Sequence, residues 1–211
     1  MFYWVKTPKI IQKLYRKRLW RQLTDKKEIF LTFDDGPTPE VTDWVLNVLE
    51  DYQAKATFFC VGKNVETHPE LFFKIVNASH SIGNHTFSHE KSWQTKTREY
   101  IESVEKTRGL IETIIGKTTR LFRPPYGRIR SKHVRALSRK GYKIVMWDVL
   151  SGDFDPTGQA DLMLIKLIQE TDKGSIIVFH DSKKAFEKLQ SLLPSYLEYW
   201  KEKGYVFNAI R

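Results

Sequence analysis

The chain has 211 residues, of which 41% are hydrophobic and 13% aromatic. This length and composition fit one globular domain with a sizeable core, and they exclude an intrinsically disordered chain. The only cysteine, Cys60, excludes an intramolecular disulfide, and its apolar neighbours in ATFFCVG predict a buried, inert thiol.

The charge of the chain is concentrated at its N-terminus. Residues 1–28 hold nine Lys or Arg and two acidic residues, so they carry +7 of the net charge of +10. Residues 29–211 are close to charge balance, which argues against a general nucleic-acid-binding surface. We therefore separate a basic amphipathic N-terminal segment, 1–28, from a main domain, 29–211.

From Pro8 onward, the N-terminal segment has the pattern of a short amphipathic helix. Two interpretations stay open: a helix packed on the domain with a solvated basic face, or an interfacial helix within residues 1–23 that contacts anionic lipid. The apolar face would hold Ile10, Ile11, Leu14, Tyr15, Leu19 and Leu23, and the basic face Lys9, Lys13, Arg16, Lys17 and Arg21.

The same segment has neither the apolar run and cleavage site of a signal peptide nor the length of a membrane span. We therefore expect a cytoplasmic or membrane-peripheral protein, and an extracytoplasmic location stays open. We also expect a monomer.

Strand-like and helix-like runs alternate through the main domain. This alternation predicts an α/β fold with parallel strands and right-handed crossovers, either an open doubly wound sheet or a (β/α) barrel. Glycine-rich phosphate-binding fingerprints are absent, so nucleotide binding has little support. The predicted strands are Ile29–Asp34, Ala56–Val61, Ser81–Asn84, Leu121–Arg123, Lys143–Asp148, Ser175–His180 and Tyr205–Ile210; the predicted helices are Pro39–Tyr52, Asn64–Ala78, Thr97–Ile115, Ser131–Lys140, Ala160–Thr171 and Lys183–Lys203.

Ionisable side chains gather where the predicted strands end. In either architecture the carboxyl ends of the strands form one rim, which is where the working site lies. Ionisable groups at five strand ends therefore predict a site on this rim. The segments are Asp34-Asp35-Gly-Pro, Asn84-His85-Thr-Phe-Ser-His89, Arg123-Pro-Pro-Tyr126-Gly, Asp148 followed by Asp153 and Asp155, and His180-Asp181.

Two histidines and an aspartate could bind a divalent cation at this rim. His85 and His89 are four residues apart, so on a helical turn both imidazoles would project from one face. One aspartate of the Asp34-Asp35 pair would complete a two-His-one-carboxylate set with open positions. The other aspartate points away on an extended chain and would suit a general base.

The remaining rim residues supply the other groups that hydrolysis needs. Arg123 could keep the aspartate that serves as general base ionised and oriented. His180 could protonate a leaving group, with Asp153 orienting its imidazole and raising its pKa. Together these groups indicate metal-assisted hydrolysis of an amide or ester.

Five ordered motifs in this chain resemble those of the polysaccharide deacetylases, the carbohydrate esterase family 4 enzymes with a NodB homology domain. The motifs are TFDDGP, H-T-x-x-H, R-P-P-Y-G, a W-x5-D segment and a late hydrophobic-x-H, and they extend from Ile29 to His180. The resemblance implies a distorted (β/α)7 barrel in a single catalytic domain, 29–211. It also implies removal of acetyl groups from sugar polymers with zinc, or with Co²⁺ or another divalent ion.

The resemblance also assigns a role to each rim residue. Asp34 would be the base, with Arg123 as its partner, and His180 the acid, supported by Asp153. The backbone N–H of Tyr126 would stabilise the oxyanion. The implied metal ligands are Asp35, His85 and His89, and the implied substrate-binding residues are Trp147, Phe154, Val178 and Pro125.

Two positions depart from the family pattern. Phe154 replaces the usual tryptophan and Val178 the usual leucine, which leaves the catalytic groups intact but bears on substrate preference. Asp148 and Asp155 have no assigned role, and we expect them to serve at the surface or as loop caps.

We therefore expect a metal-dependent N-deacetylase of acetylated amino sugars in a peptidoglycan-type or chitin-type glycan. The alternative enzymatic function is a deacetylase that acts on a lipid-linked sugar, acetylxylan or another acyl amide. A carbohydrate-binding relic is the alternative outside them, although such a protein should have lost its base, acid or metal ligands. A non-haem iron oxygenase shares the metal triad but has no need of Arg123, Asp153 and His180.

Overall fold

A curled parallel sheet forms the centre of the molecule. The computed structural model describes residues 3–211. Its strands follow the order β5-β4-β3-β2-β1-β7-β6, with β8 paired to β1, and every ladder is parallel. The strands are β1 (Glu28–Asp34), β2 (Thr57–Cys60), β3 (Ser81–Asn84), β4 (Leu121–Phe122), β5 (Lys143–Ile144), β6 (Val149–Leu150), β7 (Ile176–His180) and β8 (Val206–Asn208).

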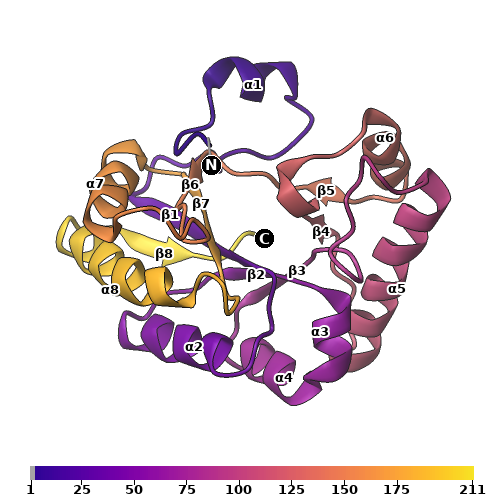
Figure 1. Ribbon diagram of the computed structural model, residues 1–211, viewed down its shortest axis with the longest axis horizontal. Coiled ribbons are helices and arrows are strands. Elements are labelled where there is room, and N and C mark those ends of the chain that lie inside the picture. Colours follow the sequence, from indigo (N-terminus) through magenta and orange to yellow (C-terminus); the bar gives the residue numbers. More distant parts are fainter. Residues whose placement is uncertain (1–2) are drawn as a thin grey trace.

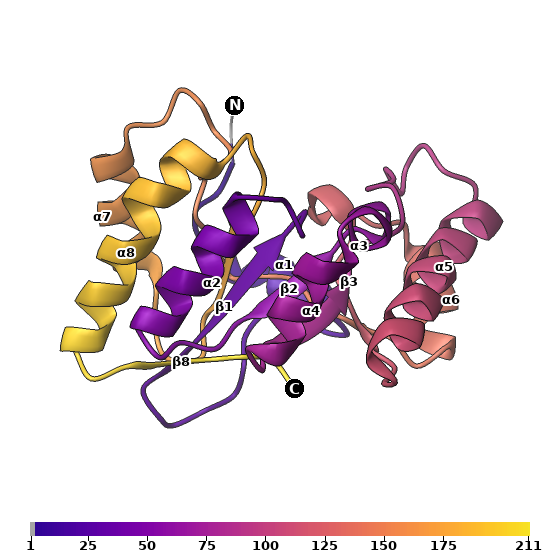
Figure 2. The same cartoon turned by 90° about the horizontal axis from the view of Figure 1, so that it is seen from below.

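Helices surround this sheet on its outer side (Figures 1 and 2). The predicted distorted (β/α)7 barrel in a single domain is thereby confirmed. The helices are α1 (Lys9–Leu14), α2 (Val41–Asp51), α3 (Gly62–Thr67), α4 (Pro69–Asn77), α5 (Thr97–Ile115), α6 (Ser131–Arg139), α7 (Ala160–Glu170) and α8 (Phe186–Glu202), with a 3-10 turn at Pro125–Gly127.

The predicted strand Lys143–Asp148 is wrong in its extent. Strand β5 ends at Ile144, and the chain then crosses to the opposite edge of the sheet, where β6 starts at Val149. Val145, Met146 and Asp148 in this crossing are buried, so the apolar run continues through a segment that is not a strand.

The N-terminal segment fills the gap between these two edges. Leu19 pairs with Val145 next to β5, and its backbone N–H donates to the carbonyl of Ile144 at 2.8 Å. On the other side Lys6 pairs with Val149 of β6, and the N–H of Leu150 donates to the carbonyl of Val5 at 2.8 Å. These bonds satisfy backbone groups that an open barrel would leave exposed at its edges.

The helix of the N-terminal segment is shorter than its pattern predicts. Helix α1 ends at Leu14, and none of its residues is fully buried. Only Ile11 of this helix packs partly against the core. None of the described helices has both the length and the hydropathy needed to cross a membrane.

The predicted helix Asn64–Ala78 is in fact two helices, α3 and α4. The break lies at His68 (φ −130°, ψ 58°), directly before Pro69. A proline ring clashes with a helical residue in front of it, so His68 leaves the helical region and Pro69 starts a new helix.

The two faces of β1 separate the core from the site. Phe33 on the outer face stacks with Phe58 and Phe179 at centroid distances of 5.1 and 5.8 Å, inside the core beneath the helices. Because side chains alternate along a strand, Thr32 and Asp34 point to the inner face of the barrel. The inner face therefore receives the first carboxylate of the site.

Candidate active site

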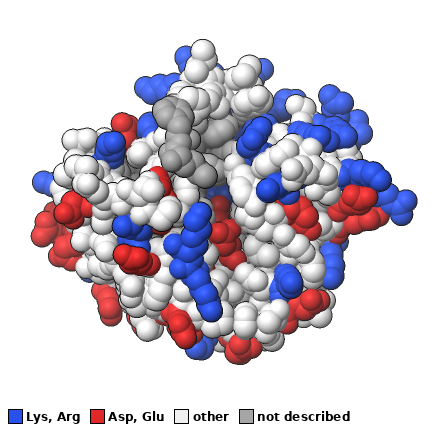
Figure 3. Space-filling model, viewed as in Figure 1, with Lys and Arg blue, Asp and Glu red and all other residues white. Residues whose placement is uncertain are grey.

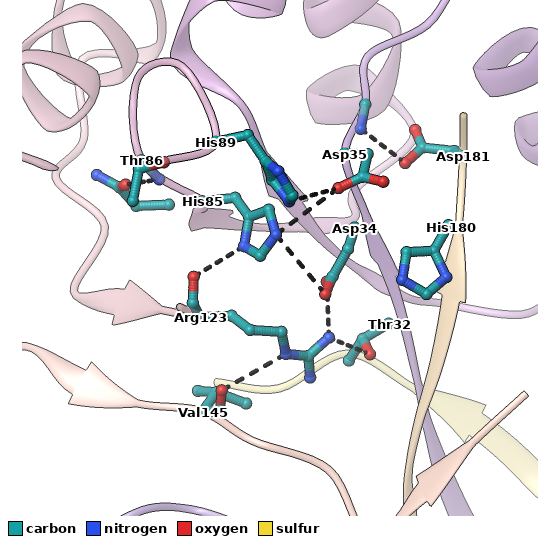
Figure 4. Close-up of polar contacts among 12 residues, drawn as sticks. Thr32, Asp34, Asp35, His85, Thr86, His89, Arg123, Val145, His180 and Asp181 are labelled. Carbon is teal, nitrogen blue, oxygen red and sulfur yellow. Dashed lines mark hydrogen bonds and ion pairs between the residues drawn. The ribbon is translucent and has the colours of Figure 1, made fainter. Parts of the chain in front are cut away.

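The first and seventh strands bring Asp34 and His180 side by side. Strands β1 and β7 are paired in a register that sets Asp34 opposite His180. The chain then turns sharply, with Asp35 in a left-handed conformation (φ 83°). This turn redirects the Asp35 carboxylate away from the direction of Asp34, toward the loop that carries the two histidines (Figure 4).

Asp181 holds this turn in place. Its Oδ1 accepts the backbone N–H of Gly36 at 3.0 Å, and its Oδ2 accepts the Thr42 hydroxyl at 2.6 Å. A Cβ at position 36 would lie 1.9 Å from Asp181 Oδ2, so only glycine fits. Burial raises the pKa of Asp181 to about 8, and the nearby Asp35 carboxylate adds to this effect. Asp181 is predicted to lie at the rim, but its place in the sequence does not indicate this role.

Asp35, His85 and His89 form the only cluster of its kind among the described residues, with one candidate ligand atom from each lying within 4.8 Å of the others. The Nε2 atoms of His85 and His89 lie 3.7 and 3.2 Å from Asp35 Oδ1 (Figure 4). That oxygen is buried and has no hydrogen-bond partner. An orphaned buried carboxylate oxygen that faces two imidazole nitrogens fits a divalent cation, and the donor set suits zinc.

The tautomer of His85 also suits a ligand. Its Nδ1 lies 2.8 Å from the carbonyl oxygen of Arg123, which can only accept, so Nδ1 carries the proton and Nε2 faces Asp35. Burial lowers the pKa of His85 to about 4, with His89 adding to the effect. Burial alone would raise the pKa of Asp35, but His89, His180 and His85 hold it well below its usual range.

The histidines reach this position from a loop, so the predicted helical turn is wrong. Thr86 and His89 both have left-handed backbone conformations (φ 66° and 58°). The loop is held by Asn84, whose Oδ1 accepts the N–H of Thr86 at 2.9 Å, and by Gly62, whose N–H donates to the carbonyl of Thr86 at 2.9 Å.

Asp34 forms a buried ion pair with Arg123. The guanidinium donates from one nitrogen to Asp34 Oδ1 and to the Thr32 hydroxyl, both at 2.7 Å. Its other terminal nitrogen donates to the carbonyl of Met146 at 3.0 Å. Asp34 Oδ2 stays on the side of the metal triad, 4.0 Å from Nε2 of His85. Thr32 was missed, although its place two residues before Asp34 puts it on the same face of the strand.

On the other side of Asp34, His180 is paired with Asp153. Asp153 is fully buried; its Oδ1 lies 2.8 Å from His180 Nδ1, and its Oδ2 accepts the backbone N–H of His180 at 2.7 Å. Burial lowers the pKa of His180, but Asp153, Asp35 and Asp34 outweigh it and raise the pKa to about 9. The imidazole is therefore protonated at neutral pH.

Aromatic side chains border the metal triad. Tyr126 is exposed, and its ring lies 4.6 Å from that of His89 and 5.5 Å from that of Trp93. The guanidinium of Arg128 lies 4.6 Å above the Trp93 ring. Pro125 is buried at the start of the same turn.

Three of the predicted substrate-binding residues lie near His180 or Arg123. The ring of Phe154 lies 5.3 Å from that of His180, and Trp147 lies 5.7 Å from the Arg123 guanidinium. Val178 is buried on β7, two residues before His180. Tyr3, which no sequence signal indicated, packs against Phe154 at 5.3 Å.

The two aspartates without a predicted role differ in structure. Asp148 is fully buried and pairs with Lys6 and Arg21 at 3.1 and 3.3 Å, so the expectation of a surface role is wrong for it. It does cap the loop before β7, because its Oδ1 accepts the N–H of Ile176 at 2.9 Å. Asp155 caps its loop as expected, because its Oδ1 accepts the N–H and hydroxyl of Thr157.

Comparison with known proteins identifies the family of the chain. The sequence model of the polysaccharide deacetylase family matches residues 21–145. The chain belongs to this family. It is 34% identical over 158 residues to a peptidoglycan-N-acetylglucosamine deacetylase of Bacillus cereus, and the match covers 75% of this chain and 57% of that relative. The chain thus spans little more than half the length of this relative.

Solved structures of the family share the fold. A peptidoglycan N-acetylglucosamine deacetylase, solved with a naphthalenyl N-hydroxybenzamide, matches with a TM-score of 0.88 at 30% identity, covering 97% of this chain and 95% of that one. A pseudoenzyme of the family from Bacillus anthracis matches with a TM-score of 0.80 at 26% identity, covering 90% of this chain and 66% of that one. The fold is therefore common to active and inactive members, and function has to be argued from the site residues.

Proposed function

We propose that the chain is a metal-dependent hydrolase that removes N-acetyl groups from amino sugars of a peptidoglycan-type glycan, with chitin-type oligosaccharides as the alternative substrate. One observation carries the proposal: the Asp35, His85 and His89 cluster and the Asp153-paired His180 lie on opposite sides of one buried carboxylate, Asp34. The relatives named above favour a peptidoglycan-type substrate. All of these groups come from one chain, so a monomer suffices.

Asp35, His85 and His89 would hold the metal, with Zn²⁺ the first candidate and Co²⁺ another. When bound there, a divalent ion would polarise the acetyl carbonyl and lower the pKa of an attacking water. The contacts of the ligands hold them in the protonation states that metal binding needs. The carbonyl of Arg123 fixes the tautomer of His85, and the low pKa of Asp35 keeps its carboxylate charged.

Asp34 would act as the general base. Its Oδ1 is occupied by the Arg123 guanidinium, which leaves Oδ2 on the side of the triad to take the proton of the attacking water. Arg123 acts through this carboxylate: its guanidinium compensates the charge of Asp34 and fixes its direction in a buried setting. Thr32 shares the same guanidinium nitrogen and helps to position it.

His180 would act as the general acid. Because Nδ1 is held by Asp153, Nε2 is left to donate a proton to the amide nitrogen as the carbon–nitrogen bond breaks. The products are acetate and the free amine of the sugar. The backbone N–H of Tyr126 would assist by donating to the oxyanion that forms on the acetyl carbonyl.

The aromatic residues would hold the sugar. Tyr126, Trp93 and Phe154 could stack against pyranose rings. Trp147 and Val178 would line the pocket for the acetyl group, and Pro125 is a further candidate for substrate binding. Phe154 provides an aromatic wall but no N–H donor, unlike the tryptophan usual in the family. A peptidoglycan substrate would place the working protein outside the cytoplasm, whereas a cytoplasmic location would require a precursor or another acyl amide.

Acetate release tests the proposal directly. The protein is stripped with a chelator, reloaded with one equivalent of zinc, and given peptidoglycan fragments, chito-oligosaccharides and acetylated xylan, with Asp34→Asn as the matched inactive variant. We expect zinc-dependent acetate from the amino-sugar substrates and none from D34N. Zinc bound without any acetate release would favour the relic or the lipid-linked substrate, and acetate from xylan alone would assign an esterase.

A further inference from the structure

Helix α1 and the turn after it present apolar side chains to solvent. Ile10 and Leu14 are 76% and 72% exposed, and they lie four residues apart, on one face of the helix. Tyr15 follows them and is 41% exposed. Among the described residues no part of the domain covers this face, which stands out from the barrel in Figure 1.

The protruding segment is fixed at both ends. Residues before it pair with β6, and residues after it pair with Val145 and Ser175. Within it, the side chain of Gln12 donates to the carbonyl of Thr7 at 3.0 Å, and the indole of Trp20 donates to the carbonyl of Tyr15 at 3.1 Å. Hydrogen bonds within the loop therefore hold the apolar residues outward. Because the loop is already ordered in the fold, binding would require little further loss of conformational entropy.

Exposed cations surround the apolar residues, and no acidic residue occurs from residue 3 to residue 24. The neighbouring helix α6 adds two more cations, and a shallow groove joins it to the segment Leu14–Arg18. Figure 3 shows Lys and Arg gathered over this side of the molecule. We call the whole surface the α1 patch: Ile10, Leu14 and Tyr15 with Lys9, Lys13, Arg16, Lys17, Lys132 and Arg135.

We propose that the α1 patch docks the protein onto a bilayer surface that contains anionic lipid. Ile10 and Leu14 would enter the boundary between headgroups and acyl chains, and the cations would contact lipid phosphates. This combination favours a membrane over nucleic acid or another soluble polyanion, which would need the charges but not the exposed aliphatic pair. The proposal does not depend on the deacetylase activity.

Exposure of apolar residues alone does not identify such a surface. Leu162 and Ile165 on α7 are also 54% and 51% exposed, but Asp161 and Glu170 lie on the same helix and only one lysine accompanies them. The α1 patch differs from this α7 surface because lysines and arginines, without acidic residues, surround its apolar side chains. Figures 1 and 2 place α1 at the side of the barrel, so docking there would leave the carboxyl ends of the strands open to a glycan.

Vesicle sedimentation tests the proposal. The full chain is mixed with vesicles of phosphatidylcholine, with or without phosphatidylglycerol, and the bound fraction is measured at low salt and in about 1 M salt, where the screening length falls to about 3 Å. We expect binding only to the anionic vesicles and a strong loss at high salt. Wild-type protein that stays in the supernatant with both vesicles would overturn the proposal.

Two variants and two matched controls separate the contributions. Ile10→Ser with Leu14→Ser should lower the partition coefficient at least about tenfold, because the apolar anchors are lost. Lys13→Glu with Lys17→Glu should lower it by at least about 25-fold, since each lysine near an anionic surface contributes about fivefold.

The controls make the same changes elsewhere: Leu162→Ser with Ile165→Ser, and Lys117→Glu with Lys166→Glu, all at exposed positions. Both should bind like the wild type. Circular dichroism and the midpoint of thermal unfolding verify that all four proteins fold. If the serine pair at α1 binds as well as the wild type while the charge pair fails, the patch is a polyanion site and the proposal is wrong. Equal losses in the controls would also refute it.

Discussion

The pairing of Asp153 with His180 offers the sharpest test of the proposed general acid. Burial alone would lower the pKa of His180 from its usual 6.5. The nearby carboxylates of Asp153, Asp35 and Asp34 outweigh burial and raise this pKa to about 9. Asp153→Asn removes the carboxylate that lies 2.8 Å from Nδ1 and leaves the burial unchanged. A divalent ion would offset the charge of Asp35. We therefore expect the pKa of His180 to fall to about 6.5 or below in this variant.

The size of the effect follows from the protonated fraction. A general acid works below its pKa and is lost as the pH rises through it. With a pKa of about 9, His180 is almost fully protonated at about pH 8, whereas with a pKa of about 6.5 only about 3% would be. The ratio kcat/KM should therefore fall about 30-fold at that pH from protonation alone, and only about twofold near pH 6.5.

The assay is acetate release by zinc-saturated protein across about pH 5 to 10, with kcat/KM plotted against pH. The basic limb should lie at clearly lower pH in D153N than in the wild type, because the carboxylate that raises the His180 pKa is lost. Asp155→Asn makes the same chemical change on the same loop without contact to His180, and its profile should match that of the wild type. A basic limb at the same pH in D153N as in the wild type, with activity lowered equally at every pH, would refute the role of His180.

Three further substitutions test the other parts of the site. Asp34→Asn should retain one zinc per chain and lower kcat by about two to four powers of ten, measured by elemental analysis and acetate release; full activity would exclude Asp34 as the base. His85→Ala should lose the metal itself, and zinc retained at one equivalent after dialysis would contradict the triad. Gly36→Ala should displace the turn that carries Asp35, since its Cβ would lie 1.9 Å from Asp181 Oδ2. We expect weaker zinc binding in a competition titration, and unchanged affinity would show that the turn adapts.

The site could be predicted closely because parallel strands end at one rim. Asp34, His85, Arg123 and His180 follow different strands, and the rim brings them into contact without any further assumption. The conformation that points the histidines inward was not predictable from their spacing. It depends on left-handed backbone at His89 and on bonds from distant segments such as α3.

The wrong predictions of strand and helix extent have a common cause. A sequence pattern reports burial and period, but not which edge of a sheet a segment will meet. The run from Ile144 to Trp147 is apolar because the crossing between β5 and β6 is largely buried, not because it is a strand. Similarly, the helical pattern beyond Leu14 is overridden because Leu19 and its neighbours pair with the open edges of the barrel.

The N-terminal segment carries the α1 patch proposed for membrane docking, and it also contacts residues that support the proposed active site. Docking therefore has to be tested without removing this segment. Asp148 is fully buried, and its charge is compensated by Lys6 and Arg21 of that segment. Deleting residues 1–22 would leave this carboxylate unpaired, at a cost of about 3–5 kcal/mol, and would expose both sheet edges. It would also remove Tyr3 from Phe154, which packs on His180. A truncated protein could thus lose activity with or without a membrane, so only point substitutions on the outer face of α1 separate docking from catalysis.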